Sequence, residues 1–266
     1  MTDKSIIEVN NLSKNFKDLK AVDNISFTVN QGEVFAFLGP NGAGKTTTIK
    51  MLTTLLHPSS GKIKVNSFDP TKEPSKVRSS FGIVFQDPSL DNELTGYENM
   101  EFHGVLYNVP KNIRKERIEY LLKFVGLWER KDDPVKTFSG GMKRRLEIAR
   151  GLIHHPKILF LDEPTLGIDP QTRNQMWTHI KSLIKKEKMT VFFTTHYMEE
   201  AEKMADIIAI IDLGKIVHKG TTSELTKSTK TKTVEEAFLK LTGHTIREER
   251  GTAKDRMRTT ARVWNV

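Results

Sequence analysis

A run of glycines followed by lysine and threonine is the first feature of this sequence that could do chemistry. Residues 39–47 have the spacing of a phosphate-binding loop, with Lys45 and Thr46 near its end. Glycines are needed because successive backbone N–H groups must face one anion, which leaves no room for Cβ atoms. We expect Lys45 to reach the β- and γ-phosphates of a nucleotide and the Thr46 hydroxyl to bind Mg²⁺. The residues predicted to bind a nucleoside triphosphate are Gly39, Pro40, Asn41, Gly42, Ala43, Gly44, Lys45, Thr46 and Thr47.

The residues on either side of this loop have the patterns of a strand and a helix. The apolar run at 34–38 is short and bulky, as in a buried strand, and residues 47–56 read as a helix that Pro58 ends. A chance match to the loop spacing has odds of roughly one in a hundred in a chain of this length. The strand and the helix therefore favour a true phosphate loop over an ordinary glycine turn.

Two adjacent carboxylates follow a second buried run. Residues 158–161 are apolar and lead directly into Asp162 and Glu163. Ionised carboxylates are unfavourable at the end of a buried strand unless they are paired, and a magnesium ion beside a phosphate is such a partner. We expect Asp162 to hold hydrated Mg²⁺ and Glu163 to orient or deprotonate an attacking water. The alternative is an acidic turn at the surface.

A histidine ends a third strand of the same kind. The buried run at 190–195 is followed by His196. In an open parallel sheet, ligands gather beyond the carboxyl ends of the strands. The strands before Gly39, Asp162 and His196 are each followed at that end by residues that could bind or act on a phosphate. The sequence therefore favours a contact from His196 to the γ-phosphate over the simpler interpretation of a satisfied polar group.

Ser139, Gly140 and Gly141 form a second glycine-containing helix start. Ser139 is well placed as the N-cap of a helix over 143–153, with Pro156 beyond its end. Such a helix N-terminus can bind an anion, but serine and glycine also begin many helices that bind nothing. Taken alone, this feature predicts a helix and leaves its function open.

The remaining segments predict an α/β fold with a helical insertion. The helical pattern at 95–127 lies between strands of the nucleotide site, so we interpret it as part of an inserted subdomain at about 90–155. Beyond Gly243 the periodicity is lost, and we expect a poorly ordered basic tail at 243–266. Phe16, ahead of the phosphate loop, either stacks on a base or belongs to the core. The other expected strands are 6–9, 21–22, 25–29, 62–65, 81–85 and the hairpin 207–211 with 216–217, and the other expected helices are 171–185 and 234–241.

Composition is typical of a soluble intracellular protein. The chain has 266 residues, of which 37% are hydrophobic and 28% charged, and it contains no cysteine. Disulfides and thiolate metal sites are thereby excluded. We find no run near the about 18 apolar residues of a membrane span and expect no signal peptide at its start. The net charge of +9 fits a solvated surface with a loose tail, an anionic membrane face or nucleic acid, and by itself it does not decide among them.

In their order along the chain, these motifs resemble the nucleotide-binding subunit of an ATP-binding cassette (ABC) transporter over residues 5–242. The resemblance implies an α/β P-loop NTPase of ABC type, with a mainly parallel sheet, an N-terminal antiparallel β subdomain and an inserted helical subdomain. The phosphate loop matches the Walker A motif of this family. Residues 159–163 match its Walker B strand, which ends in the catalytic glutamate, Glu163.

The resemblance also assigns roles that spacing leaves open. Gln86 stands where the family has a glutamine that contacts Mg²⁺ and the attacking water and links to the membrane partner. Asp169 matches the D-loop aspartate at the dimer interface, and His196 matches the switch histidine. Phe16 stands where the family stacks an aromatic ring on adenine.

The signature motif of the family matches Ser139, Gly140 and Gly141, although Phe138 and Met142 replace its usual leucine and glutamine. In the family, two subunits pair head to tail, and these residues of one copy cap the ATP held by the other. The resemblance therefore implies that Ser139 and both glycines bind ATP in trans, within a homodimer or a pair of ABC ATPase subunits.

Three longer stretches are similar to one subgroup, the daunorubicin-resistance ATPases of ABC-2 type exporters. They are residues 138–150, 195–200 and 235–243. In that group the membrane subunit is a separate chain. The resemblance implies ATP hydrolysis with Mg²⁺, coupled to transport of a drug, lipid or polysaccharide-like cargo through a permease. It places the protein at the cytoplasmic face of the cell membrane and implies no specific nucleic acid partner.

The strongest alternative is a soluble ABC-type ATPase of DNA repair or translation. Repair proteins separate the two Walker motifs by long coiled coils, whereas the segment between Lys45 and Asp162 has no sustained heptads. Translation factors carry two cassettes in one chain, and one is present here. A phosphate-loop kinase or GTPase would leave Ser139 and His196 without a role.

Overall fold

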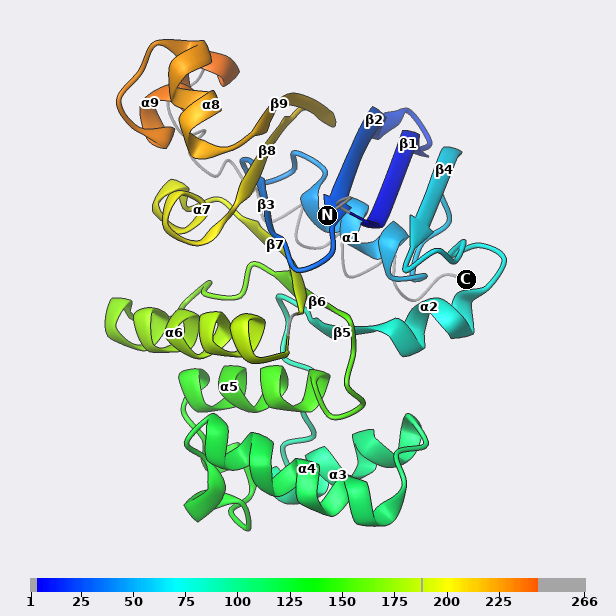
Figure 1. The fold of residues 1–266 in the computed structure, drawn as a ribbon, viewed down its shortest axis with the longest axis vertical. Helices are drawn as coiled ribbons and strands as arrows, with labels where there is room; N and C mark the ends of the chain where they lie inside the picture. The colour runs from blue at the N-terminus through cyan, green and yellow to red at the C-terminus, as the bar shows by residue number, and fades with distance from the viewer. Residues whose placement is uncertain (1–3, 188, 244–266) are drawn as a thin grey trace.

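The computed structural model describes residues 4–187 and 189–243, and Figure 1 labels its principal elements. The strands are β1 (Ser5–Phe16), β2 (Leu19–Asn30), β3 (Val34–Leu38), β4 (Ser60–Val65), β5 (Phe81–Val84), β6 (Ile158–Asp162), β7 (Thr190–Thr195), β8 (Ile207–Asp212) and β9 (Lys215–Gly220). The α-helices are α1 (Lys45–Leu52), α2 (Pro74–Ser80), α3 (Gly96–Leu106), α4 (Lys111–Phe124), α5 (Gly140–Gly151), α6 (Pro170–Glu187), α7 (Met198–Met204), α8 (Thr222–Thr229) and α9 (Val234–Thr242). Two short 3₁₀ helices are η1 (Trp128–Arg130) and η2 (Val135–Thr137).

A six-stranded sheet forms the centre of the molecule, in the order β5-β6-β7-β3-β8-β9. Neighbouring strands from β5 to β8 are parallel, and β9 is antiparallel to β8. Every residue of β3, β6 and β7 is buried, as expected where both faces of a parallel sheet are covered. Because β6, β7 and β3 are neighbouring parallel strands, their carboxyl ends lie side by side. The predicted mainly parallel sheet is confirmed.

The N-terminal strands form a separate antiparallel sheet in the order β2-β1-β4. We expected two short strands at 21–22 and 25–29, but β2 runs through both without a break. The polar residues between them sit at a shift in the register against β1, and Asn24 takes a left-handed conformation with φ 53°. A β-bulge absorbs the extra residue without ending the strand.

Alternating side chains of β3 anchor it in two hydrophobic cores, one on each face of the sheet. Phe35 and Phe37 pack with Phe27 and Phe192 at ring-centroid distances of 5.3–5.7 Å. Ala36 and its neighbours of the same parity belong to the opposite core. Burial on both faces fixes the end of β3, which is where the phosphate loop begins.

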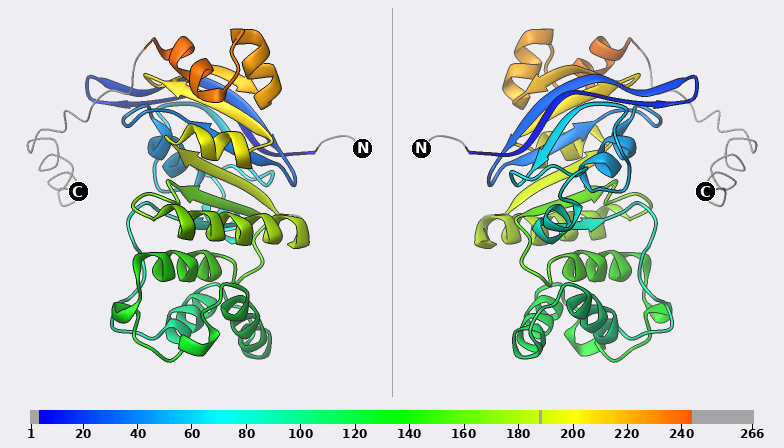
Figure 2. Two further views of the ribbon diagram at one scale, coloured as in Figure 1. Left: turned by 90° about the vertical axis from the view of Figure 1, so that its left-hand side faces the viewer. Right: turned by 90° about the vertical axis from the view of Figure 1, so that its right-hand side faces the viewer.

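Helices α3, α4 and α5 lie together at one end of the molecule, with α8 and α9 at the other (Figures 1 and 2). The helical pattern at 95–127 is two helices, because Asn108 at φ 55° and Pro110 interrupt it. Helices α2, α7 and α8 were not predicted, since seven or eight residues give too few turns for a clear period. That residues 90–155 act as a subdomain of an ATPase domain at 5–242 stays a prediction. The tail predicted at 243–266 lies outside the described residues except for Gly243.

Candidate functional site

The phosphate loop joins β3 to α1 and has the backbone that its glycines predict. Gly42 and Gly44 have φ of 77° and 106°, a left-handed region that other residues seldom adopt. A Cβ atom on Gly44 would lie 2.6 Å from the carbonyl oxygen of Ala21. Among the described residues, no side chain caps the N-terminus of α1 at Gly44, so the first N–H groups of this helix can bind an anion.

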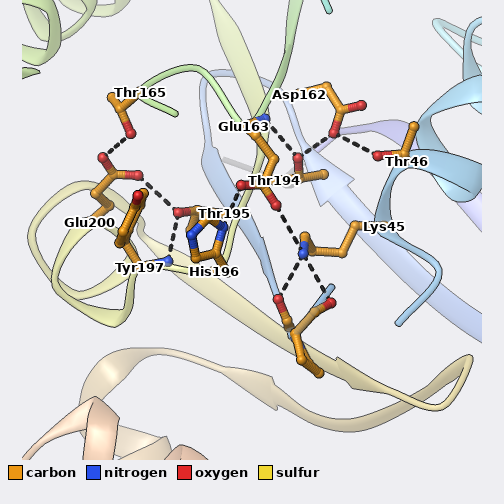
Figure 3. Close-up of polar contacts among 12 residues, drawn as sticks. Lys45, Thr46, Asp162, Glu163, Thr165, Thr194, Thr195, His196, Tyr197 and Glu200 are labelled. Carbon is orange, nitrogen blue, oxygen red and sulfur yellow. Dashed lines mark hydrogen bonds and ion pairs between the residues drawn. The ribbon is translucent and has the colours of Figure 1, made fainter. Parts of the chain in front are cut away.

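The Lys45 side chain is buried in the loop and lies against the catalytic candidates (Figure 3). Its Nζ donates to the carbonyl oxygens of Gly39 at 2.7 Å and Pro40 at 3.1 Å, and it lies 2.9 Å from Glu163 Oε1. The loop lysine therefore contacts the carboxylates after β6 through Glu163. Its two bonds to carbonyl oxygens are contacts that phosphate oxygens can replace.

Glu163 is held from several sides in a conformation that is uncommon for a residue with a side chain. Its φ is 49°, and its backbone N–H donates to both oxygens of Thr194, at 3.0 and 3.2 Å. Its Oε2 lies 2.5 Å from His196 Nδ1. Burial by itself raises the pKa of the Glu163 carboxyl, but the hydrogen bond to His196 and the charge of Lys45 outweigh it, so this pKa lies below its ordinary value. Glu163 is thus ionised at neutral pH.

The two carboxylate oxygens of Asp162 differ in their contacts with the described residues. Its Oδ1 accepts from Thr194 Oγ1 at 2.5 Å and from Thr46 Oγ1 at 3.2 Å, whereas its buried Oδ2 has no hydrogen bond within the described residues. Burial raises the pKa of this carboxyl, and the two donating hydroxyls partly counteract it. A buried oxygen without a donor, next to a hydroxyl, fits a hard cation such as Mg²⁺.

Lys45, Thr46 and Glu163 line a cavity of about 480 Å³, whereas Asp162 contacts Thr46 but is not itself among the lining residues. The walls of this cavity combine the phosphate loop with four other segments of the chain, and they include Gln86, His196 and Phe16. Phe16 is 39% exposed, so the interpretation of this ring as core is wrong. The complete lining is Phe16, Leu19, Ala21, Asn41, Gly42, Gly44, Lys45, Thr46, Thr47, Gln86, Glu163, Leu166 and His196.

The residues that match the signature motif are not part of this cavity. Ser139, Gly140 and Gly141 are absent from the residues that line this cavity. Ser139 caps α5 as predicted, since its Oγ accepts from Met142 N at 3.3 Å, and the helix therefore begins at Gly140 rather than at 143. A Cβ on Gly140 would meet nothing within 4 Å, whereas one on Gly141 would lie 2.5 Å from Thr172 Cγ2. The helix start thus presents an open backbone at Gly140.

Asp169 also lies away from the cavity. Its Oδ1 accepts from Thr172 N at 3.0 Å, one residue before α6 begins at Pro170. This is an N-cap bond, which satisfies one of the free N–H groups at the start of the helix. A role at a dimer interface stays a prediction.

Sequence reasoning missed two residues that join the elements of the site (Figure 3). Thr194 links Asp162 to the backbone of Glu163, as described above. Glu200, in the first turn of α7, is buried and accepts hydrogen bonds from Thr165 Oγ1 and, at 2.9 Å, from Thr195 Oγ1. The hydroxyls at the end of an otherwise apolar strand were the available signal, because such groups need partners when buried.

Comparison with known proteins gives one consistent result. The family model described as "ABC transporter" matches residues 22–166. The chain is 44% identical over 220 residues to the linearmycin resistance ATP-binding protein LnrL of Bacillus subtilis (strain 168), covering 83% of this chain and 70% of LnrL. It is also 44% identical over 222 residues to the daunorubicin/doxorubicin resistance ATP-binding protein DrrA of Streptomyces peucetius, covering 84% and 67%. A Nod factor export ATP-binding protein I of Ralstonia nicotianae is 40% identical over 83% of this chain and 68% of its own length.

Solved structures agree with the sequence comparisons. An ATP-binding subunit of an ABC transporter matches with a TM-score of 0.81 and 28% identity, over 89% of this chain and 99% of that one. A dimeric ATP-binding cassette in a post-hydrolysis state, bound to ADP and Pi, matches with a TM-score of 0.74 and 25% identity, over 81% and 98%. None of these relatives supports the alternative of a soluble ATPase acting on nucleic acid.

Within residues 4–187 and 189–243, no helix combines the length and the hydropathy that crossing a membrane requires. The fold, the phosphate loop, the carboxylates after β6 and the relatives all agree. This chain belongs to the ATP-binding, ATP-hydrolysing proteins of the ABC transporter family.

Proposed function

We propose that this chain is the ATPase subunit of an exporter, working as one of two paired copies beneath a separate membrane permease. The observation that carries the proposal is the series of contacts from Lys45 through Glu163 to His196, with Asp162 and Thr46 beside it. These residues lie at the carboxyl ends of β3, β6 and β7, where ligands of open parallel sheets bind.

Each residue has a role that its contacts support. Lys45 exchanges its bonds to the loop carbonyls for the β- and γ-phosphates of ATP, which gain a charge-assisted contact. Glu163 takes or orients a proton of the attacking water, because its carboxylate is ionised. His196 holds Oε2 of the Glu163 carboxylate and reaches the γ-phosphate. Phe16, exposed at the cavity wall, stacks on the adenine.

Mg²⁺ would be held by Thr46, Asp162 and Gln86. When bound, it neutralises charge on the β- and γ-phosphates. Support for these ligands comes from the Oδ2 of Asp162, which no described residue hydrogen-bonds, from the neighbouring Thr46 hydroxyl and from the position of Gln86 on the cavity wall.

Asp162→Asn is expected to weaken Mg²⁺ binding to the ATP-loaded protein by about tenfold or more, because a neutral amide replaces the anionic ligand. The measurement is the Mg²⁺ concentration at half-maximal ATP hydrolysis, together with Mg²⁺ titration of the nucleotide-loaded protein. Asp132→Asn, at a side chain that is 76% exposed, should leave both unchanged. An unaltered Mg²⁺ requirement in Asp162→Asn would remove this residue from the proposed ligands.

A second copy is needed to complete the site. Ser139 and Gly140 do not line the cavity of their own chain, and the backbone at Gly140 is open. We propose that they and Gly141 cap ATP held by a paired subunit, with Asp169 at the interface. A two-fold arrangement of this kind buries two nucleotides between the copies.

Helix α3 supplies a surface for the permease. Phe102, Val105 and Leu106 are 57%, 50% and 76% exposed, and their spacing places them on one face of the helix. Exposed apolar side chains that gather on one face mark sites of protein contact. Helix α3 follows the segment that carries Gln86, so a displacement of the helix can be passed through this segment to the cavity wall.

Phe102→Asp is expected to lower the amount of membrane subunit that co-purifies by about tenfold, because a charge replaces an apolar side chain that the permease would cover. The ATP affinity of the isolated protein should not change. Leu55→Asp, at a leucine that is 58% exposed outside α3 and α4, is the matched control. Normal co-purification of Phe102→Asp would place the permease on another surface.

The whole proposal is tested by purifying the protein from membranes of its own host in mild detergent. We expect a membrane-spanning chain to accompany it and ATP to be hydrolysed. The names of the relatives make a drug the first cargo to test, with lipid and polysaccharide-like molecules next, in a comparison of resistance between cells with and without the protein. Ribosomes or DNA in place of a membrane chain would contradict the proposal.

A further inference from the structure

A buried arginine of α5 contacts four backbone carbonyls around the proposed hydrolysis site. Arg144 is 7% exposed. Its Nε donates to Pro164 O at 2.7 Å, and its Nη2 donates to the carbonyl oxygens of Asp162 and Glu163, both at 3.2 Å. Its Nη1 donates to Phe85 O at 2.5 Å. One guanidinium therefore connects the turn after β6 with the segment after β5.

A buried glutamate on the same helix neutralises this arginine and holds the same segment. Glu147 is 3% exposed, and its Oε2 lies 3.1 Å from Arg144 Nη1. Its Oε1 accepts from Ser89 N at 2.7 Å. Burial lowers the pKa of the Arg144 guanidinium, and the charge of Glu147 counteracts the shift. The pair is thus satisfied without any ligand.

These contacts act where the catalytic backbone is least favourable. Glu163 has φ 49°, a conformation that a residue with a Cβ adopts only when its surroundings enforce it. Three consecutive carbonyls, of Asp162, Glu163 and Pro164, are fixed by the rigid, planar fork of Arg144. Phe85, whose carbonyl is fixed by the same group, directly precedes Gln86.

We infer that Arg144 is a positioning residue for ATP hydrolysis, which holds the backbone of Glu163 and that of Gln86 in fixed relation to each other. Because Ser139 is the N-cap of α5, Arg144 also connects the helix start proposed to cap ATP of the paired copy with the hydrolysis site of its own copy. This inference rests on the proposed function, since it assumes the roles given there to Glu163 and Gln86.

The next residue along the helix provides a matched control. Arg145 is half-buried, and its Nη1 donates to Val125 O at 2.7 Å, away from the turn after β6. Arg144→Met and Arg145→Met remove the same charge and the same number of donors from adjacent positions of α5. Of the two arginines, only Arg144 contacts Asp162, Glu163 and the segment before Gln86.

The experiment compares kcat for ATP hydrolysis with ATP affinity in the full-length protein. We expect Arg144→Met to lower kcat by about 100-fold, because a small misplacement of a catalytic group has an effect of that size. The dissociation constant of ATP should stay within about threefold of the parent value, since the phosphate loop is untouched. Arg145→Met should keep kcat within about threefold of the parent.

A second variant covers the case in which Arg144→Met folds poorly because Glu147 is left buried and unpaired. Arg144→Met with Glu147→Met removes both charges, so its melting temperature should recover while kcat stays low. Recovery of kcat in this double variant would overturn the inference, because Arg144 would then serve only to neutralise Glu147. A normal kcat in Arg144→Met would overturn it as well.

Failure of the proposed function gives a different result. Turnover in Glu163→Gln at the parent rate would remove Glu163 from the mechanism, whatever Arg144 does. A low kcat in Glu163→Gln together with a normal kcat in Arg144→Met refutes only the inference about Arg144.

Discussion

Glu163→Gln is expected to lower kcat for ATP hydrolysis by about 1,000-fold, as loss of a general base does, while ATP still binds. The amide is nearly isosteric with the carboxylate and can still accept a hydrogen bond from Lys45 Nζ, which lies 2.9 Å from Glu163 Oε1. It cannot take a proton from water at neutral pH. ATP should therefore accumulate unhydrolysed, and with it the closed pair of subunits.

Two measurements check this prediction. Single-turnover hydrolysis of ATP reports the chemical step, and size-exclusion chromatography with and without ATP reports the paired form. Glu199→Gln is the control, because Glu199 also lies next to the site in sequence but its side chain is 85% exposed. Hydrolysis by Glu163→Gln at the parent rate, or an ATP-dependent pair in the parent but not in the variant, would contradict the assigned role.

Lys45→Ala is expected to weaken ATP binding by about 100-fold, the size of the loss of a hydrogen bond between a charged donor and a phosphate. A second effect follows from burial. The side chain of Lys45 is 5% exposed and that of Glu163 is 6% exposed. Removing one partner of such a pair leaves a buried charge and lowers the free energy of unfolding by about 3 kcal/mol.

Equilibrium dialysis with Mg²⁺-ATP and urea unfolding without nucleotide measure the two effects separately. Lys50→Ala is the control, because Lys50 belongs to the same helix, α1, but is exposed. It should change neither quantity appreciably. If Lys45→Ala bound ATP as tightly as the parent, the loop would not be the triphosphate site.

The sequence predicted those features that depend on neighbouring residues. The backbone of the predicted phosphate loop is such a feature, because its glycines are needed locally, and Gly42 and Gly44 do take left-handed conformations. The N-cap at Ser139 and strand β7 at residues 190–195 were likewise predicted. Their signals, a capping oxygen and an apolar run, lie within a few positions of the structure that they specify.

Element boundaries were predicted less well. The strands at 21–22 and 25–29 are one strand, since pairing with β1 carries β2 through a polar bulge. The helical pattern at 95–127 is two helices, because Pro110 and the left-handed Asn108 end the first. In the first case hydrogen bonds to a partner strand carry the element past its local pattern, and in the second a local break ends a helix within a longer apolar pattern.

By itself, the sequence determined which chemical groups this protein has. It also determined that three strands are each followed by residues of types that can bind or act on a phosphate. Only the tertiary structure decided which groups meet. Parallel pairing of β3 and β6 with β7 brings Lys45 against Glu163, and packing of α5 places Arg144 on the carbonyls of the same turn. The reason is that strand order and helix packing are set by burial summed over the whole chain, and no local pattern records which distant segments will be neighbours.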